Sequence, residues 1–139
     1  MIRRLLLAAA TVLTVACSGS PSSSLPSAEY SQVDVRTGTG AEAVNGRTLL
    51  VHYTLWLYDP GGAEQKGRQL ETSIGKQPFT FTLGVREVIP GWDRGVAGMK
   101  AGGVRRLIVP PALAYGSGGR DSVPPNATLV FDIELLSVE

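Results

Sequence analysis

The chain has 139 residues, of which 43% are hydrophobic and 18% are charged, and its formal net charge is +1. This composition fits one ordinary globular domain with short extensions, and the near-neutral charge offers no basic face for nucleic acid. The single cysteine excludes an internal disulfide and a multi-cysteine metal cluster, and the single histidine excludes a histidine-rich metal site.

Residues 1–16 have the pattern of a secretory signal peptide. Arg3 and Arg4 form a basic start, and an almost unbroken apolar run follows from Leu5 to Val15. The run is shorter than the roughly 20 residues that a membrane-spanning helix needs. Ala16 followed by Cys17 resembles a bacterial lipoprotein cleavage site, which predicts that Cys17 becomes the lipidated first residue. The alternative is an ordinary secretory signal cut after Ala16, which would leave a free thiol.

Residues 17–28 are rich in serine and proline and are expected to form a tether, because such a stretch cannot bury enough apolar surface to order itself. With a lipid on Cys17, this tether would hold the domain formed by residues 29–139 close to a membrane. We therefore expect an exported protein that is lipid-anchored to the cell envelope. By resemblance to bacterial sorting signals, Ser18 gives no retention signal of the aspartate type, which favours the outer membrane, facing the periplasm.

Period-two alternation of apolar residues predicts about five strands in the folded part. The segments with this pattern are 30–37, 47–58, 79–83, 104–109 and 127–138, and residues 68–73 are expected to form a return strand after a turn at 59–62. The long segment 47–58 carries apolar residues on both faces, so we expect its outer face to be partly covered.

Residues 91–99 are the best helix candidate. Trp92, Val96 and Met99 fall at i, i+4 and i+7 on one stripe, and a proline at position 90 is tolerated at a helix start. Gly102-Gly103 is expected to end the segment. One short helix packed on one face of an antiparallel sheet makes an α+β domain.

Short motifs run through the whole folded region in a fixed order. They are Val51-His52-Tyr53-Thr54, Pro78-Phe79-Thr80-Phe81, Leu83-Gly84, Glu87 to Trp92, Gly95 to Met99, Ala114-Tyr115-Gly116 and Pro124 through Leu136. Together they resemble the FKBP-type peptidyl-prolyl cis-trans isomerases in order and in spacing. The resemblance implies an FKBP-like fold, with a five- or six-stranded antiparallel sheet wrapped around one short helix, and it implies isomerase activity on X–Pro bonds.

The resemblance also implies an aromatic-lined pocket between the sheet and the helix. The implied catalytic residues are Tyr53, Glu71, Tyr115 and Phe131, and the implied substrate-binding residues are Tyr53, Leu70, Phe79, Val88, Ile89, Trp92, Tyr115, Val123 and Phe131. The prolyl ring would lie on Trp92, while the backbone N–H of Ile89 and the hydroxyl of Tyr115 would hold substrate carbonyls. Leu70-Glu71 stands where the family usually has Phe-Asp, so an aromatic wall is lost and the carboxylate is one methylene longer.

Amide resonance sets the barrier to rotation about an X–Pro bond at about 18–20 kcal/mol. A site can lower this barrier without a nucleophile, metal or cofactor if it grips the proline ring and stabilises the turned carbonyl specifically. We therefore expect no cofactor and no metal, and we expect proline-containing unfolded or partly folded polypeptides of the extracytoplasmic space as substrates. The resemblance adds macrolide inhibitors as ligands.

Two alternatives to this isomerase remain open. The first is a chaperone-like peptide-binding module with weak or no isomerase activity, which the Leu70-Glu71 pair keeps open. The second is a structural envelope lipoprotein that binds no prolyl peptide. Outside the pocket we expect Phe81 in the core, His52 as a hydrogen-bonded structural residue and Arg105-Arg106 as a solvated pair. A monomer is expected, since no long helical segment precedes the domain.

Overall fold

The computed structural model describes residues 24–139, so the predicted signal peptide and Cys17 lie outside the described residues. The strands are β1 (Ser31–Arg36), β2 (Thr48–Tyr58), β3 (Lys66–Thr72), β4 (Phe79–Thr82), β5 (Val104–Val109) and β6 (Leu129–Val138). The helices are α1 (Pro90–Val96) and two short 3-10 turns, η1 (Ala63–Gln65) and η2 (Pro111–Leu113). Among residues 24–139, no helix is both long enough and apolar enough to cross a membrane.

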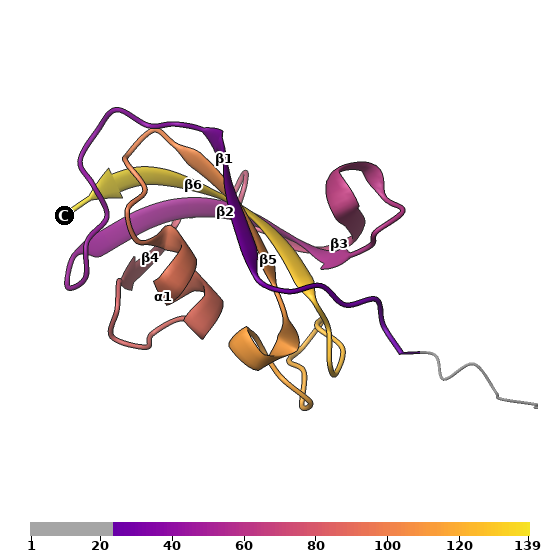
Figure 1. The fold of residues 1–139 in the computed structure, drawn as a ribbon. Coiled ribbons are helices and arrows are strands. Elements are labelled where there is room, and N and C mark those ends of the chain that lie inside the picture. Colours follow the sequence, from indigo (N-terminus) through magenta and orange to yellow (C-terminus); the bar gives the residue numbers. More distant parts are fainter. Residues whose placement is uncertain (1–23) are drawn as a thin grey trace, which may run out of the picture.

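All strands belong to one six-stranded antiparallel sheet with the order β1-β5-β6-β2-β3, and β4 pairs with β2. Strand β2 is the longest and contacts β6, β3 and β4, so it organises the sheet. Figure 1 shows the sheet curving over one face of α1. The predicted α+β, FKBP-like arrangement of five or six strands around one short helix is confirmed.

The core lies between this curved face and α1, as the alternation along the strands predicts. Every second residue of β2 and β6 is buried and meets the buried face of α1; these core residues include Leu49, Val51, Leu55, Leu129, Phe131, Ile133, Leu135, Trp92 and Val96. The outer face of β2 is half-buried for most of its length, as expected from its apolar residues.

Helix α1 is shorter than predicted, because it ends at Val96 and not at Met99. Gly98 has a φ of +84°, a left-handed conformation that a helix cannot continue through. Met99 remains in the core, 3% exposed, but from the turn that follows. The predicted terminator Gly102-Gly103 instead shapes the turn before β5.

The return strand begins at Lys66, two residues earlier than predicted. The preceding turn η1 places Glu64 and Gln65 at positive φ and delivers Lys66 onto the outer face of the sheet. There its Nζ lies 2.8 Å from Oδ2 of Asp132 on β6 and 4.1 Å from the centre of the Trp56 ring. Ion pairing therefore extends the strand where the sequence suggested a polar loop.

The prediction that Arg105-Arg106 is a solvated pair is wrong. Consecutive strand residues point to opposite faces. Arg105 points inward, is 9% exposed, and donates to Asp34 Oδ1 at 2.7 Å and to the carbonyls of Gly95 and Ala97 at 2.8 and 3.0 Å. Arg106 points outward and donates to the two carboxylate oxygens of Asp132 at 2.7 and 3.0 Å. Both guanidinium groups are structural because their acceptors come from distant parts of the chain.

Candidate active site

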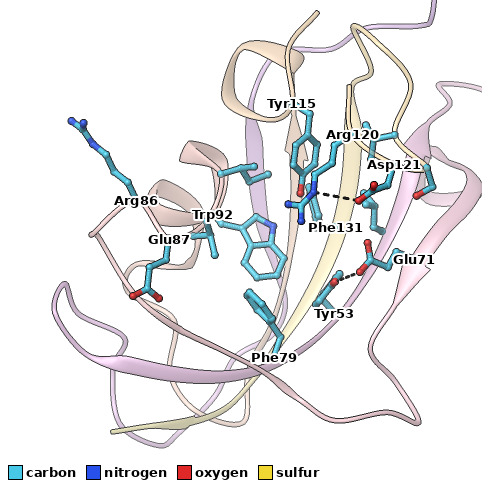
Figure 2. A pocket seen from close by; sticks show the side chains of 15 residues that line it. Tyr53, Glu71, Phe79, Arg86, Glu87, Trp92, Tyr115, Arg120, Asp121 and Phe131 are labelled. Atoms are coloured by element: carbon cyan, nitrogen blue, oxygen red, sulfur yellow. Dashed lines mark hydrogen bonds and ion pairs between the residues drawn. The ribbon is translucent and has the colours of Figure 1, made fainter. Parts of the chain in front are cut away.

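A cavity of about 660 Å³ opens between α1 and the sheet. Figure 2 shows its side chains converging from β2, β3, β6, the segment before α1 and the loop before β6. The lining residues are Tyr53, Leu55, Glu71, Phe79, Arg86, Glu87, Val88, Ile89, Trp92, Tyr115, Arg120, Asp121, Ser122, Val123 and Phe131. Aromatic and aliphatic groups form its inner part, and charged groups stand around its mouth.

Trp92 forms the floor of the cavity and is 4% exposed. Its ring centre lies 5.1 Å from that of Tyr53, 5.5 Å from Phe131, 5.6 Å from Phe81 and 5.9 Å from Phe79, with three of these four contacts edge-to-face. Such geometry fixes the indole plane, because edge-to-face pairs are favoured by the ring quadrupoles. The indole Nε1 is buried and has no hydrogen-bond partner among the described residues.

Tyr53 and Glu71 form a polar pair at one side of the mouth. The Tyr53 hydroxyl donates a short hydrogen bond to Oε1 of Glu71, which stands on β3 opposite Leu55 (Figure 2). Burial raises the pKa of Tyr53 strongly, and the hydrogen bond and charge of Glu71 raise it further. Tyr53 therefore keeps its proton across the physiological range, and Glu71 is held in place as an acceptor.

The backbone of Tyr53 is held by Ser73, a residue that sequence reasoning did not connect with the pocket. Ser73 Oγ accepts the Tyr53 N–H at 2.8 Å, and the Ser73 N–H donates to the Tyr53 carbonyl at 2.9 Å. Nδ1 of His52 lies 2.9 Å from the same Ser73 Oγ. His52 is thus hydrogen-bonded as predicted, and this contact supports its neighbour in the chain.

The segment between β4 and α1 brings Val88 and Ile89 to the cavity. Asp93 on α1 accepts the backbone N–H groups of Gly84 and Arg86 at 2.9 and 3.1 Å, which ties this segment to the helix. Glu87 is also engaged, because its Oε2 accepts the N–H of Thr82 at 2.8 Å. Within residues 24–139, the Ile89 N–H has no hydrogen-bond acceptor, which leaves it free for a ligand.

Tyr115 stands on the far side of the mouth and is half-buried. Burial raises the pKa of its hydroxyl above the ordinary tyrosine value, so the group is a neutral hydrogen-bond donor. Val123, which is 7% exposed, closes the cavity below the loop of residues 117–122. Two hydroxyl groups and one backbone N–H thus surround an apolar floor, an arrangement that can hold an apolar ring and receive carbonyl oxygens.

All predicted site residues except Leu70 line this cavity. The pairing of β2 with β3 explains the exception: Leu55 pairs with Glu71 and Trp56 with Gln69, so Leu70 is the extra residue of a bulge. Leu70 packs against the core and does not reach the cavity. Glu71 therefore faces the pocket, although the residue expected to form a wall beside it does not.

Six lining residues were missed from the sequence: Leu55, Arg86, Glu87, Arg120, Asp121 and Ser122. Leu55 shares the inward face of β2 with Tyr53, so strand alternation could have indicated it. The other five lie on loops, where no periodic pattern assigns a direction to a side chain. Phe81 was correctly placed in the core, at 2% exposed.

Known proteins show the same sequence and fold. The family model for FKBP-type peptidyl-prolyl cis-trans isomerases matches residues 40–136. An FK506-binding protein of Neisseria meningitidis serogroup B is 47% identical over 107 residues, which cover 76% of this chain and 92% of that protein. FK506-binding protein 4 of Dictyostelium discoideum is 48% identical over 105 residues, or 75% of this chain and 27% of that longer protein.

Two solved structures are similar across most of the chain. The crystal structure of FkpA from Escherichia coli matches with a TM-score of 0.66 and 38% identity, over 79% of this chain and 48% of that chain. The crystal structure of AtFKBP13 matches with a TM-score of 0.65 and 36% identity, over 79% of this chain and 93% of that chain.

Proposed function

This chain belongs to the family of FKBP-type peptidyl-prolyl cis-trans isomerases and is an isomerase of X–Pro bonds, and from this premise we propose that the cavity around Trp92 is its active site. The observation that carries the proposal is the floor of the cavity. Four aromatic rings hold the Trp92 indole in place, and hydroxyl donors stand only at the rim. An apolar floor with a few convergent polar groups is suited to an imino-acid ring.

In the proposed mechanism the prolyl ring lies on Trp92, between Tyr53 and Phe131. The Ile89 N–H and the Tyr115 hydroxyl receive the carbonyl oxygens on either side of the ring. The amide then twists among mainly apolar groups, and donors placed where the turned carbonyl lies stabilise the twisted state more than the planar one. Glu71 keeps the Tyr53 ring against the substrate through its hydrogen bond.

Isomerisation of Leu-Pro and Phe-Pro tetrapeptides, followed in a protease-coupled assay, tests this proposal. We expect acceleration that is saturable in peptide and that disappears when FK506 occupies the cavity. A rate equal to that of the spontaneous reaction would favour the alternative of a chaperone-like binding module. Peptide binding without any rate enhancement would identify that alternative directly.

We further propose that the enzyme works outside the cytoplasm, on exported polypeptides that fold near a membrane. The apolar run of residues 5–15 and the Ala16-Cys17 pair support export and lipidation, and the serine- and proline-rich tether supports attachment at a distance. Labelling of cells with radioactive palmitate should mark the wild-type protein and the Ser18→Ala control, but not Cys17→Ala. Unaltered labelling of Cys17→Ala would refute the lipid site.

We propose FK506-type macrolides as ligands of the same cavity, because relatives of this chain are named FK506-binding proteins. The loss of the aromatic wall at Leu70, which does not reach the cavity, argues for weaker binding than a complete aromatic wall would give. Titration calorimetry should give one macrolide per chain, and light scattering should give the mass of a monomer.

A further inference from the structure

One cation at the mouth of the cavity has no strong partner. The side chain of Arg120 is 67% exposed, and Figure 2 shows it beside Tyr115 with its guanidinium group over the cavity. Its carbon Cζ lies 5.7 Å from the centre of the Tyr115 ring. The group thus stands next to the hydroxyl that is expected to receive a substrate carbonyl.

The backbone of Arg120 is fixed even though its side chain is free. Its N–H donates to the carbonyl of Val123 at 2.9 Å, and the N–H of Val123 donates back at 2.6 Å. Gly119 has a φ of +64°, and a Cβ at this glycine would lie 2.5 Å from the Val123 oxygen. This tight turn sets the point from which the Arg120 side chain leaves the rim, directly above a residue that lines the cavity.

The pairing of Arg120 with Asp121 is weak. Among the described residues, Asp121 is the only carboxylate within 4 Å of Arg120; the contact is 3.4 Å long, and the Asp121 side chain is 87% exposed. Arg106, by contrast, makes two bonds of 2.7 and 3.0 Å to Asp132 on the outer face of the sheet. An exposed pair of this kind contributes little, so Arg120 can exchange Asp121 for another carboxylate at small cost.

The other charges at the mouth are placed differently. The carboxylates of Glu71 and Glu87 each hold a partner, the Tyr53 hydroxyl and the Thr82 N–H. Arg86 points away from the cavity on the opposite side (Figure 2). The cation beside Tyr115 is therefore the group best placed to receive an additional charged side chain from a bound peptide.

We infer that Arg120 is a specificity-determining residue, which favours substrates that carry an acidic side chain next to the proline. This inference rests on the proposed active site. A peptide whose proline lies on Trp92 and whose carbonyl meets Tyr115 brings the flanking side chain to the rim where Arg120 stands. The carboxylate of the substrate then replaces Asp121 as the partner of the guanidinium group.

Magnetisation-exchange NMR on short peptides measures this preference without a coupling protease. The substrates are matched pairs with Glu or Gln before the proline, and Glu or Gln after it. We expect Arg120→Gln to lower the Glu-to-Gln ratio of kcat/KM by about 1.5- to 5-fold in at least one pair. Asp121→Asn should raise the same ratio, because it removes the competing carboxylate, and 1 M salt should reduce the wild-type preference.

Arg68→Gln is the matched control, because it removes the same charge from an exposed position of β3 outside the cavity. It should leave the ratio unchanged. A Glu-to-Gln ratio that Arg120→Gln does not alter in either pair would overturn the inference, while catalysis of the Gln peptides would still support the active site. Failure of the wild type on every peptide would instead contradict the proposed function.

Discussion

Tyr53 is held at both of its ends. Ser73 binds its backbone N–H and carbonyl, and Glu71 accepts its hydroxyl proton. Both partners come from the same short stretch at the end of β3, so this stretch sets the position of one wall of the cavity. The ring in turn contacts Trp92 at 5.1 Å, which passes the constraint on to the floor.

Replacing Ser73 with alanine tests this constraint. The Tyr53 N–H would lose its acceptor in a partly buried place, so we expect the free energy of unfolding to fall by about 1–3 kcal/mol. Urea denaturation measures the change. Ser137→Ala on β6 is the control, because no side-chain hydrogen bond of Ser137 is found in the described part of the chain. Equal stabilities of the two variants would contradict the role given to Ser73.

Tyr115→Phe tests the proposed donor to the substrate carbonyl. Loss of one hydrogen bond corresponds to about 0.5–1.5 kcal/mol, so kcat/KM should fall roughly 2- to 12-fold while circular dichroism stays unchanged. Tyr58→Phe, at the far end of β2 and outside the cavity, should have no effect. Unimpaired catalysis by Tyr115→Phe would remove this residue from the mechanism.

The pH dependence follows from the same hydroxyl. Burial raises the pKa of Tyr115, so the donating, neutral form persists as the pH rises past the ordinary onset of tyrosine ionisation. We expect kcat/KM to stay level up to about pH 9, below the ordinary tyrosine pKa of about 10. A decline centred near neutral pH would assign control of the rate to another group.

At the scale of elements, α1 sits unusually close to β5, and Gly95 makes this possible. A Cβ at Gly95 would lie 2.6 and 2.7 Å from the two Cδ atoms of Leu107 and 2.7 Å from the Tyr30 hydroxyl. The carbonyl of Gly95 also accepts a hydrogen bond from the buried Arg105 at 2.8 Å, which satisfies the end of the helix. Close approach and capping together seat the helix that carries Trp92.

We therefore expect Gly95→Ala to destabilise the protein by about 1–2 kcal/mol, although alanine favours a helix by about 1 kcal/mol over glycine. The midpoint of urea denaturation gives the change. Gly118→Ala is the control, since a Cβ at Gly118 meets no atom within 4 Å. A stabilising effect of Gly95→Ala would show that Leu107 moves aside without cost.

The elements that the sequence predicted well are those whose pattern is local. Apolar alternation located β2, β5 and β6, and the resemblance placed the aromatic floor around Trp92. The errors share a different origin, because each depends on a distant partner. The early start of β3 follows from the pairing of Lys66 with Asp132, and the displacement of Leu70 follows from a bulge against β2.

The charged rim of the site was also beyond the sequence. The directions of Arg120 and Arg86 are set by the loops that carry them and not by a strand or helix period. The burial of Arg105 depends on carbonyl groups at the end of α1, a contact that is visible only once the helix is packed on the sheet.

Across the whole molecule, the outer face of the sheet is joined by an ion-pair network. Lys66 on β3 and Arg106 on β5 both bind Asp132 on β6, and both also lie near Glu64, at 2.8 and 3.4 Å. Burial alone would raise the pKa of Asp132, but the hydrogen bonds and charges of Arg106 and Lys66 outweigh it and lower the pKa. Three strands are thus linked by one carboxylate.

This network predicts acid sensitivity. The pKa of Asp132 is lower in the folded than in the unfolded state, so its stabilising contribution is present above the unfolded value of about 3.9 and is lost as the pH falls further. Asp132→Asn should therefore be less stable than wild type at pH 7, with the difference shrinking below about pH 4. Urea denaturation at several pH values measures it. The exposed Glu29→Gln should follow the wild-type curve; a constant difference for Asp132→Asn would contradict the assignment.

The positions of the two indoles on opposite faces of the sheet have a spectroscopic consequence. Trp92 is sealed beneath the substrate, whereas Trp56 is half-buried on the outer face under the ammonium group of Lys66. Acrylamide should therefore quench the emission of Trp56 first and leave that of Trp92. In Trp56→Phe the remaining emission would come from the cavity alone, so each binding event of a client polypeptide becomes visible without any attached dye.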